Sequence, residues 1–549
     1  MNAHLILEDT PTRQEQKLKT LSKYVQKYPL GWKKRLELAA VLYEMGRWEE
    51  AIAQYRQVLM RQRPLTIDVY LQLGKLLHLM GKQEDAIAVY REALSLCDSP
   101  ATEQHLKGLI EVCRGCPQQA VKMFESAAAV EPGNPAHWYA LAQVHLNTDS
   151  PLGALRAFDA ALSLNPNDII ALSQSYDTLL AVGNFQEARR RLERVLTLAP
   201  DDCRAIAQLA THRCYQGLVS GETGKQTKQL IKTALAVAPD SATAHQVLSL
   251  YHLCRGKWEK AVAVLLKFTE EHPNNPMGWY HYARCLFHTG QFQAAADASL
   301  RAYALYQNDC EIYRTLCEIL PAAGRLEAFG IDSLQSPKLT ISPYIPPLPR
   351  GARGVKGEQE NRLAIQTTTP PSSHLPISLL QEMLTRFPQH WSVWVTAGRV
   401  LVETFKDIER GCSVSAQAVQ LQPQLPDAWF LHGRVLALAG RHREAVEALE
   451  QGWRSQPKGY LQLVSAAVWL GESYQALGDE LRSRKWWEEA LHSAEALMEF
   501  HPATAYYWKG RALLGLGNVQ GAREAYRNSL KQHLPYPARS EVKESLQYL

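Results

Sequence analysis

Long apolar runs and one-sided charge are both missing from this sequence of 549 residues. No stretch approaches eighteen uninterrupted apolar residues, so we expect no membrane-spanning helix. Lys and Arg together number 60 and Asp and Glu together number 55, which leaves a net charge of only +5. Nucleic-acid-binding proteins usually concentrate far more positive charge, so we expect no nucleic-acid partner.

Markers of secretion are scarce as well. The opening residues, MNAHLILEDTPTRQEQK, contain a three-residue apolar patch followed by acidic residues, which is unlike a signal peptide. The ten cysteines are scattered without a compact framework, as in proteins that keep their thiols reduced. These features together predict a cytoplasmic location.

Motifs for catalysis and for metal binding are also absent, including H-E-x-x-H, G-x-S-x-G and the dinucleotide-binding glycine fingerprint. The string GETGKQT resembles the end of a phosphate-binding loop, but Val219 stands where its first glycine should be and Gln226 replaces its Ser or Thr. His281, Cys285 and His288 share one helix face, yet no further ligand is fixed in sequence, so ordinary packing explains them better than a metal. We therefore predict a protein that is not an enzyme and has no cofactor and no metal.

What the sequence does contain is an internal repeat. Five alanines recur at a nearly constant interval and illustrate the period: Ala51, Ala86, Ala120, Ala154 and Ala188. Within one period, apolar residues at three- and four-residue steps predict two amphipathic helices. Gly74 and Ala86 are small enough to let these helices approach closely, while Tyr70 and Tyr90 fill the space beside the contact. Five extra residues between Ala188 and Ala261 are expected in a longer loop at 215–225.

These residues resemble the tetratricopeptide repeat, a helix–turn–helix unit of about 34 residues. Its W-x2-L-G…A-x3-F…P signature is matched in one period by Trp138, Leu141, Ala142, Ala154, Phe158 and Pro166. The resemblance recurs along nearly the whole chain. It implies an all-α solenoid of about 12–13 helix–turn–helix repeats, and it implies protein binding rather than catalysis.

The repeat spacing divides the chain into four parts. Residues 1–15 form an N-terminal tail and residues 16–330 a first array. The periodicity vanishes over 331–376, where abundant Pro, Gly, Ser and Thr predict a disordered linker. A second array occupies 377–549, with a wider spacing between Gly440, Gly478 and Gly517 than the first array shows. The sequence leaves open whether the two arrays form one continuous superhelix.

Four of the expected first helices carry related strings, namely WYALAQ, WYHYAR, WFLHGR and YYWKGR. In each, an aromatic residue lies four residues before a Gln or Arg, so the two side chains share a helix face. The resemblance places this face in the groove of the superhelix. The predicted peptide groove, with Lys75 at the matching place of the second repeat, consists of Lys75, Tyr139, Gln143, Tyr280, Arg284, Phe430, Arg434, Tyr507 and Arg511. Alternatively, these aromatic side chains only pack between repeats and the arginines are solvated surface charges.

An arginine beside an aromatic ring suits peptides with acidic and apolar side chains. We therefore predict a non-catalytic scaffold or adaptor that binds partner proteins or peptides along this groove. One alternative is a substrate-recruiting subunit of a separately encoded enzyme. A second, less favoured by the charge balance, is an RNA-binding helical solenoid. The sequence identifies neither the partner and its pathway nor the oligomeric state.

Overall fold

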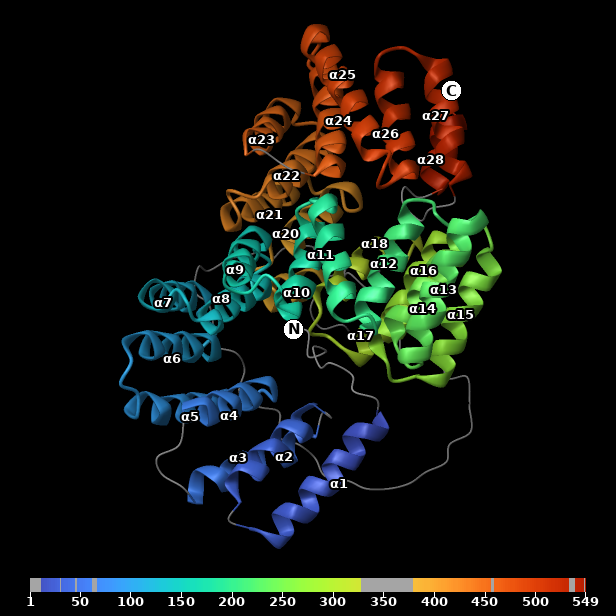
Figure 1. The fold of residues 1–549 in the computed structure, drawn as a ribbon. Coiled ribbons are helices and arrows are strands. Elements are labelled where there is room, and N and C mark those ends of the chain that lie inside the picture. Colours follow the sequence, from blue (N-terminus) through green and yellow to red (C-terminus); the bar gives the residue numbers. More distant parts are fainter. Residues whose placement is uncertain are drawn as a thin grey trace.

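The chain folds into consecutive α-helices that stack side by side into a superhelix (Figure 1). The computed structural model describes residues 11–29, 31–44, 47–61, 67–326, 379–455, 459–532, 539–547 and 549. Within these ranges every regular element is a helix. The predicted linker at 331–376 and the first ten residues of the expected tail lie outside them.

After α1 (Pro11–Lys27), the helices alternate between the first and the second helix of each repeat. Before residue 327 the first helices are α2 (Trp32–Glu44), α4 (Ile67–Leu79), α6 (Pro100–Cys113), α8 (Pro135–Asn147), α10 (Ile169–Ala181), α12 (Cys203–Tyr215), α14 (Ala242–Cys254), α16 (Pro276–His288) and α18 (Cys310–Ala322). The second helices there are α3 (Trp48–Arg61), α5 (Gln83–Ser95), α7 (Pro117–Val130), α9 (Pro151–Leu164), α11 (Phe185–Leu198), α13 (Gly221–Val237), α15 (Trp258–Glu271) and α17 (Phe292–Leu305).

The C-terminal part continues the same alternation from residue 379. It comprises α19 (Leu379–Arg386), α20 (Trp391–Glu403), α21 (Ile408–Leu421), α22 (Pro426–Leu438), α23 (His442–Arg454), α24 (Tyr460–Ala476), α25 (Glu480–Leu497), α26 (Pro502–Gly515), α27 (Val519–Lys531) and α28 (Arg539–Gln547). The described helices from α2 to α27 form thirteen pairs. The predicted all-α solenoid of 12–13 repeats is therefore confirmed.

Several first helices begin in the same way, as α8 illustrates. Pro135 occupies the first turn, where its missing N–H costs no hydrogen bond, and the Asn134 side chain accepts a hydrogen bond from the backbone N–H of Ala136 at 3.1 Å. The Trp138 indole N–H donates to the carbonyl of Pro132 at 3.0 Å. The same bond to a proline six residues earlier is made by Trp279, Trp394 and Trp429. It fixes the angle at which the chain enters the helix.

Small residues let the two helices of a repeat approach closely. A Cβ atom added at Gly74 would lie 2.3 Å from the ring of Tyr90, and one added at Gly471 would lie 2.7 Å from the ring of Trp487. Tyr90 and Trp487 are buried in two different core clusters of the solenoid. The packing expected from the sequence for Gly74 and Tyr90 is thus confirmed.

Variation in repeat length is absorbed mainly by helices. The predicted longer loop at 215–225 is right only in part. Residues 216–220 separate α12 from α13, compared with 182–184 between α10 and α11, but α13 begins at Gly221 and extends to 17 residues, whereas the second helices from α7 to α11 have 14. The wider spacing near the C-terminus has the same origin, since α24 has 17 residues and α25 has 18. An added helical turn keeps every backbone group paired, which an extended loop does not.

The helices on either side of residues 327–378 belong to one packed repeat. Glu382 on α19 accepts hydrogen bonds from the Tyr303 hydroxyl of α17 at 2.7 Å and from the Tyr313 hydroxyl of α18 at 2.8 Å. A single apolar cluster also runs from Leu316 of α18 through Leu379 of α19 to Val393 of α20. Helix α19 therefore covers α18 as a second helix covers a first helix elsewhere.

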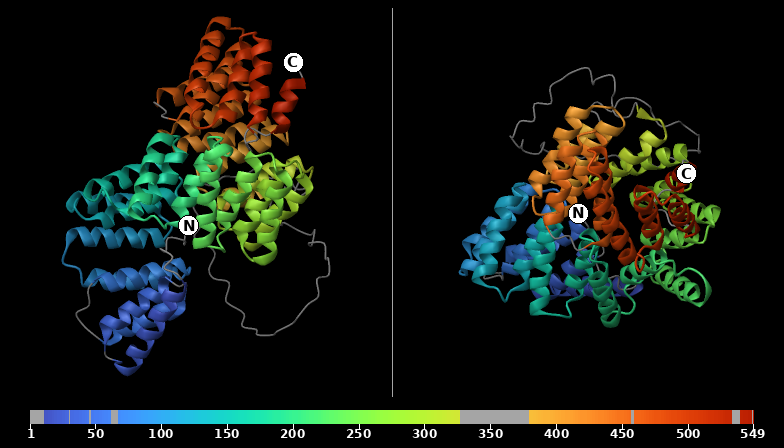
Figure 2. Two further views of the ribbon diagram at one scale, coloured as in Figure 1. Left: turned by 45° about the vertical axis from the view of Figure 1, so that its right-hand side comes forward. Right: turned by 90° about the horizontal axis from the view of Figure 1, so that it is seen from above.

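Successive turns of the superhelix touch each other. Helices α20–α28 lie on α8–α15 in both side views (Figures 1 and 2). The Ser392 hydroxyl donates to the Asp149 carboxylate at 2.6 Å, and the rings of Phe185 and Phe500 stack with centroids 5.8 Å apart. The Arg539 guanidinium lies 5.2 Å from the Trp258 ring. Repeats six or seven positions apart in the chain thus become neighbours.

Candidate interaction surface

One charged side chain occupies the same register in each of six consecutive first helices, α16, α18, α20, α22, α24 and α26. We call these residues the charged row: Arg284, Glu318, Arg399, Arg434, Glu472 and Arg511. Four of them directly follow a glycine at which the helix packs closely against its partner, namely Gly398, Gly433, Gly471 and Gly510, and Arg284 and Glu318 follow the buried residues Ala283 and Cys317. Since successive residues differ by about 100° around a helix, the charged side chain points away from that contact.

In the last three repeats the charged row is linked by a shared carboxylate. Glu472 accepts a hydrogen bond from the Arg434 guanidinium at 3.3 Å, and its other oxygen pairs with Arg511. The two guanidinium groups also lie over tryptophan rings, Arg434 at 5.5 Å from Trp469 and Arg511 at 5.3 Å from Trp508. Burial lowers the pKa of Arg434. At Arg511 burial also acts to lower the pKa, but Glu472, Tyr507, Tyr526 and Glu541 together outweigh it and raise the pKa. Both side chains remain cationic at any physiological pH.

In the preceding three repeats the charged row lines a small cavity of about 90 Å³ between α16, α18 and α20. Arg284, Arg314 and Arg399 contribute guanidinium groups, and Glu311 and Glu318 contribute carboxylates. Arg284 donates to the Tyr280 hydroxyl at 3.2 Å, with its guanidinium 5.8 Å from that ring.

Two histidines on α16 lie close to this cavity and remain neutral. Burial, followed by the repulsion of the nearby Arg284 charge, lowers the pKa of His281 and that of His288 to about 3. Cys285 on the same helix completes no ligand set with them, because among the described residues no group of three His, Cys, Asp or Glu side chains is placed to hold a metal.

The predicted groove residues do not form one continuous surface. Tyr280 pairs with Arg284 and Tyr507 with Arg511, whose guanidinium lies 6.0 Å from the tyrosine ring, as expected. Phe430 is only 1% exposed and packs against Gly452, so Arg434 lies over Trp469 instead. The expected pairing of Phe430 with Arg434 is therefore wrong.

The predicted groove residues in the N-terminal part lie on other helices. Lys75 on α4 is exposed, yet the surrounding protein lowers its pKa by reducing its solvation. Gln143 on α8 is also exposed and donates to the Asn147 side chain at 3.0 Å. Burial and the nearby Asp168 raise the pKa of Tyr139 on the same helix. The role of all nine residues in binding stays a prediction.

Five residues of the charged row and its cavity were not predicted from the sequence: Glu311, Arg314, Glu318, Arg399 and Glu472. The predicted groove residues pair a charge or an amide with an aromatic residue four positions before it, but Val395 precedes Arg399 and Val468 precedes Glu472 at that distance. The position directly after the small packing residue would have identified the row, as at Gly398 before Arg399.

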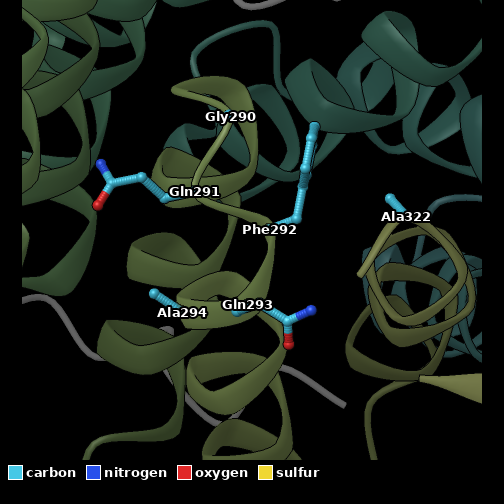
Figure 3. Close-up of a pocket in the computed structure, with 6 residues that line it drawn as sticks. All are labelled: Gly290, Gln291, Phe292, Gln293, Ala294 and Ala322. Atoms are coloured by element: carbon cyan, nitrogen blue, oxygen red, sulfur yellow. The ribbon is translucent and has the colours of Figure 1, made fainter. Parts of the chain in front are cut away.

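A larger depression of about 470 Å³ lies at the turn between α16 and α17 and the end of α18. Phe292 and Gln293 point toward the side on which Ala322 lies, whereas Gln291 points the other way (Figure 3). Gln293 donates to the backbone carbonyl of Ala323 at 2.7 Å, which ties α17 to the end of α18. No charged side chain lines this depression, so it offers no polar chemistry comparable to the charged row.

No helix in the described part of the chain combines the length and apolarity that crossing a membrane requires. The ten cysteines are all free, and six of them are buried.

Family models for the tetratricopeptide repeat match the chain at 34–99, at 107–169, 247–309 and 470–533, and at 426–451. The chain is 26% identical over 239 residues to the protein CTR9 homolog of Arabidopsis thaliana, covering 40% of this chain and 20% of that protein. It is 27% identical over 168 residues to the human protein O-mannosyl-transferase TMTC3, covering 30% of this chain and 18% of that protein. The chain thus spans about a fifth of the length of these curated relatives.

Two solved structures are among those to which this chain is similar. A tetratricopeptide repeat protein from Parabacteroides merdae is 17% identical with a TM-score of 0.34, covering 43% of this chain and 94% of that one. The Cut9 and Hcn1 hetero-tetramer of the APC/C is 14% identical with a TM-score of 0.37, covering 98% of this chain and 94% of the matched chain.

Proposed function

Because the chain belongs to the tetratricopeptide-repeat family, we propose that it is a non-catalytic scaffold that binds partner proteins along its charged row. The observation that carries the proposal is the row itself. Six consecutive first helices, α16 to α26, each contribute one charged residue in the same register, with four arginines against two glutamates. Such a strip favours acidic segments of a partner over basic ones.

The scaffold works by presenting many contacts on a rigid support. The helix pairs hold each charged side chain at a fixed place, so little conformational freedom is lost when a partner binds. The contacts between superhelical turns, such as Asp149 with Ser392, add to this rigidity. Affinity then accumulates over several repeats rather than in one deep pocket.

We propose that the partner is not a nucleic acid, because the net charge is only +5. We also propose a cytoplasmic location, because the ten cysteines are free. The transferase named in one relative is an activity of that protein. This chain corresponds to 18% of its length, so we propose no such activity here.

Site-specific photo-cross-linking in the source cells tests the scaffold. A benzoyl-phenylalanine replaces Glu318, an exposed member of the charged row, or Glu488, an exposed residue of α25 that serves as the control. We expect discrete protein adducts from position 318 that are absent from position 488. Identical adducts from both positions, or none from position 318, would refute binding along the row, and turnover by the purified chain would refute the non-catalytic role.

A further inference from the structure

The cavity between α16, α18 and α20 carries more positive charge than its own carboxylates neutralise. Three guanidinium groups, from Arg284, Arg314 and Arg399, face the two carboxylates of Glu311 and Glu318. The three arginines come from three consecutive first helices, so they converge on the cavity from different sides. Its volume of about 90 Å³ has room for several water molecules.

The guanidinium groups in this cavity keep donors available. Arg314 pairs with Glu311 on its own helix, but its Nε atom is buried and has no hydrogen-bond partner among the described residues. Arg399 lies 3.7 Å from Glu403, which is too long for a hydrogen bond. A guanidinium has five N–H donors, so a single carboxylate leaves most of them unused.

The neighbouring repeats contain the same arrangement in a completed form. There Arg434, Glu472 and Arg511 follow one another in the charged row, and the oxygens of Glu472 pair with both arginines. Arg284, Glu318 and Arg399 follow one another in the same register one set earlier. No ion pair joins Glu318 to either arginine in the described part of the chain, and Glu318 is exposed. Within the described residues, Glu472 therefore bridges two arginines in one set, whereas Glu318 forms an ion pair with neither arginine in the other.

We propose that this cavity binds an oxyanion group, a carboxylate or a phosphoryl group, at the end of a side chain in an extended segment of a partner protein. Planar guanidinium groups bind both oxyanions through paired N–H donors. A cation is disfavoured by the excess of arginine over carboxylate among the lining residues. This inference rests on the proposed scaffold function, because it names the chemistry of one subsite within the charged row.

Fluorescence anisotropy with three labelled peptides on the full-length chain tests the site. The probes are Gly-Ser-Glu-Gly-Glu-Gly-Ser, the same peptide with phosphoserine in place of both glutamates, and a neutral version with glutamine. We expect the acidic probes to bind about tenfold or more tightly than the neutral probe, with competition by inorganic phosphate. The tighter of the two acidic probes identifies the source of the oxyanion.

Two substitutions separate a specific site from general charge attraction. Arg399→Gln removes one cavity donor, while Arg484→Gln removes an exposed charge on α25 that pairs with Glu488 at 3.2 Å. We expect about tenfold weaker acidic-probe binding for Arg399→Gln and no such loss for Arg484→Gln. Arg399→Lys keeps the charge but not the paired donors, so its loss should be smaller than that of Arg399→Gln. Circular dichroism melting checks that each variant stays folded.

Equal binding of the neutral probe, unchanged binding by a folded Arg399→Gln variant, or no acidic binding at millimolar concentration would overturn the proposal. The scaffold function has its own readout. If position 318 of the parent chain gives protein cross-links while the acidic probes fail to bind that same chain, the scaffold function stands and the oxyanion site is wrong.

Discussion

Removing the Glu382 carboxylate tests whether the two parts of the chain form one repeat in solution. Glu382 on α19 accepts hydrogen bonds from Tyr303 at 2.7 Å and from Tyr313 at 2.8 Å. Tyr313 is 0% exposed and Tyr303 is 9% exposed. The substitution Glu382→Ala therefore leaves two buried hydroxyl groups without their acceptor.

The magnitude follows from the cost of unsatisfied buried groups. A hydrogen bond to a charged group contributes about 1.5–3 kcal/mol, and a buried donor without an acceptor costs about 1–3 kcal/mol. Because the two bonds share one carboxylate and water can enter the space left by truncation, the losses do not add fully. We expect about 2–4 kcal/mol of local destabilisation. Glu382→Gln keeps one acceptor oxygen, so its effect should be smaller.

The destabilisation should be confined to the helices around α19. Stability in a repeat solenoid is approximately a sum over neighbouring repeats, so distant repeats are insulated. Native-state hydrogen exchange with peptide-level mass spectrometry should show exchange in 379–386 accelerated about 30- to several-hundred-fold. Peptides covering α4 and α5 provide an internal reference within the same molecule.

An exposed ion pair supplies the matched control. Glu488 on α25 pairs with Arg484 at 3.2 Å, and both side chains are mostly exposed. Glu488→Ala should change exchange little, because exposed pairs contribute about 0–1 kcal/mol. Unchanged exchange of 379–386 in Glu382→Ala would mean that α19 does not cover α18 in solution, and the continuous superhelix would then be refuted.

Three further perturbations probe other parts of the solenoid. His212 on α12 and His501 before α26 lie at the contact between turns, with ring centroids 6.5 Å from Phe500 and 5.0 Å from Phe185, respectively. Burial, followed by the charge of a neighbour (Arg189 and His212, respectively), lowers the pKa of both histidines to about 4, so the contact is fully stable above about pH 6.5 and weakens as the pH falls toward 4. Hydrogen exchange of α12 and α26 against pH should follow this window, and a flat profile would contradict it. Glu472→Gln should leave Arg434 and Arg511 without the negative charge that they share, and we expect urea unfolding to show α24 destabilised by about 1–2 kcal/mol. This is less than for a fully buried ion pair because the side chains are partly solvated. An unchanged free energy of unfolding would show that Glu472 does not pair with the two arginines. Gly471→Ala should cost about 1–3 kcal/mol because its Cβ would lie 2.7 Å from the Trp487 ring, and a melting temperature equal to that of the parent chain would contradict this close contact.

The sequence by itself determined the repeat unit, because the contacts within a repeat are local. Gly74 and Tyr90 lie on the two helices of one repeat, and their packing depends only on the short turn that joins those helices. The proline and tryptophan of one repeat are six residues apart, as in Pro132 and Trp138. Such contacts recur with the period of the chain, so the pattern of small, aromatic and proline residues is sufficient to predict the fold class and the number of repeats.

The same local pattern could predict only part of the candidate site. Tyr280 and Arg284 share a helix face, so their pairing is visible in the sequence. Which carboxylate an arginine meets is decided by the next repeat, as Glu472 shows by pairing with both Arg434 and Arg511. The burial of Phe430 likewise depends on how far the second helix α23 reaches along α22, which spacing does not reveal.

Only the tertiary structure decided how the two parts of the chain meet. Asp149 and Ser392 are 243 residues apart, and Phe185 and Phe500 are further apart still. Whether such residues touch depends on the small rotation between neighbouring repeats, summed over six or seven of them, so a few degrees per repeat would separate them. No periodic signal in the sequence encodes that sum. The contact of α19 with α18 across residues 327–378 is likewise a property of the assembled solenoid, because nothing in the intervening composition specifies which helix covers which.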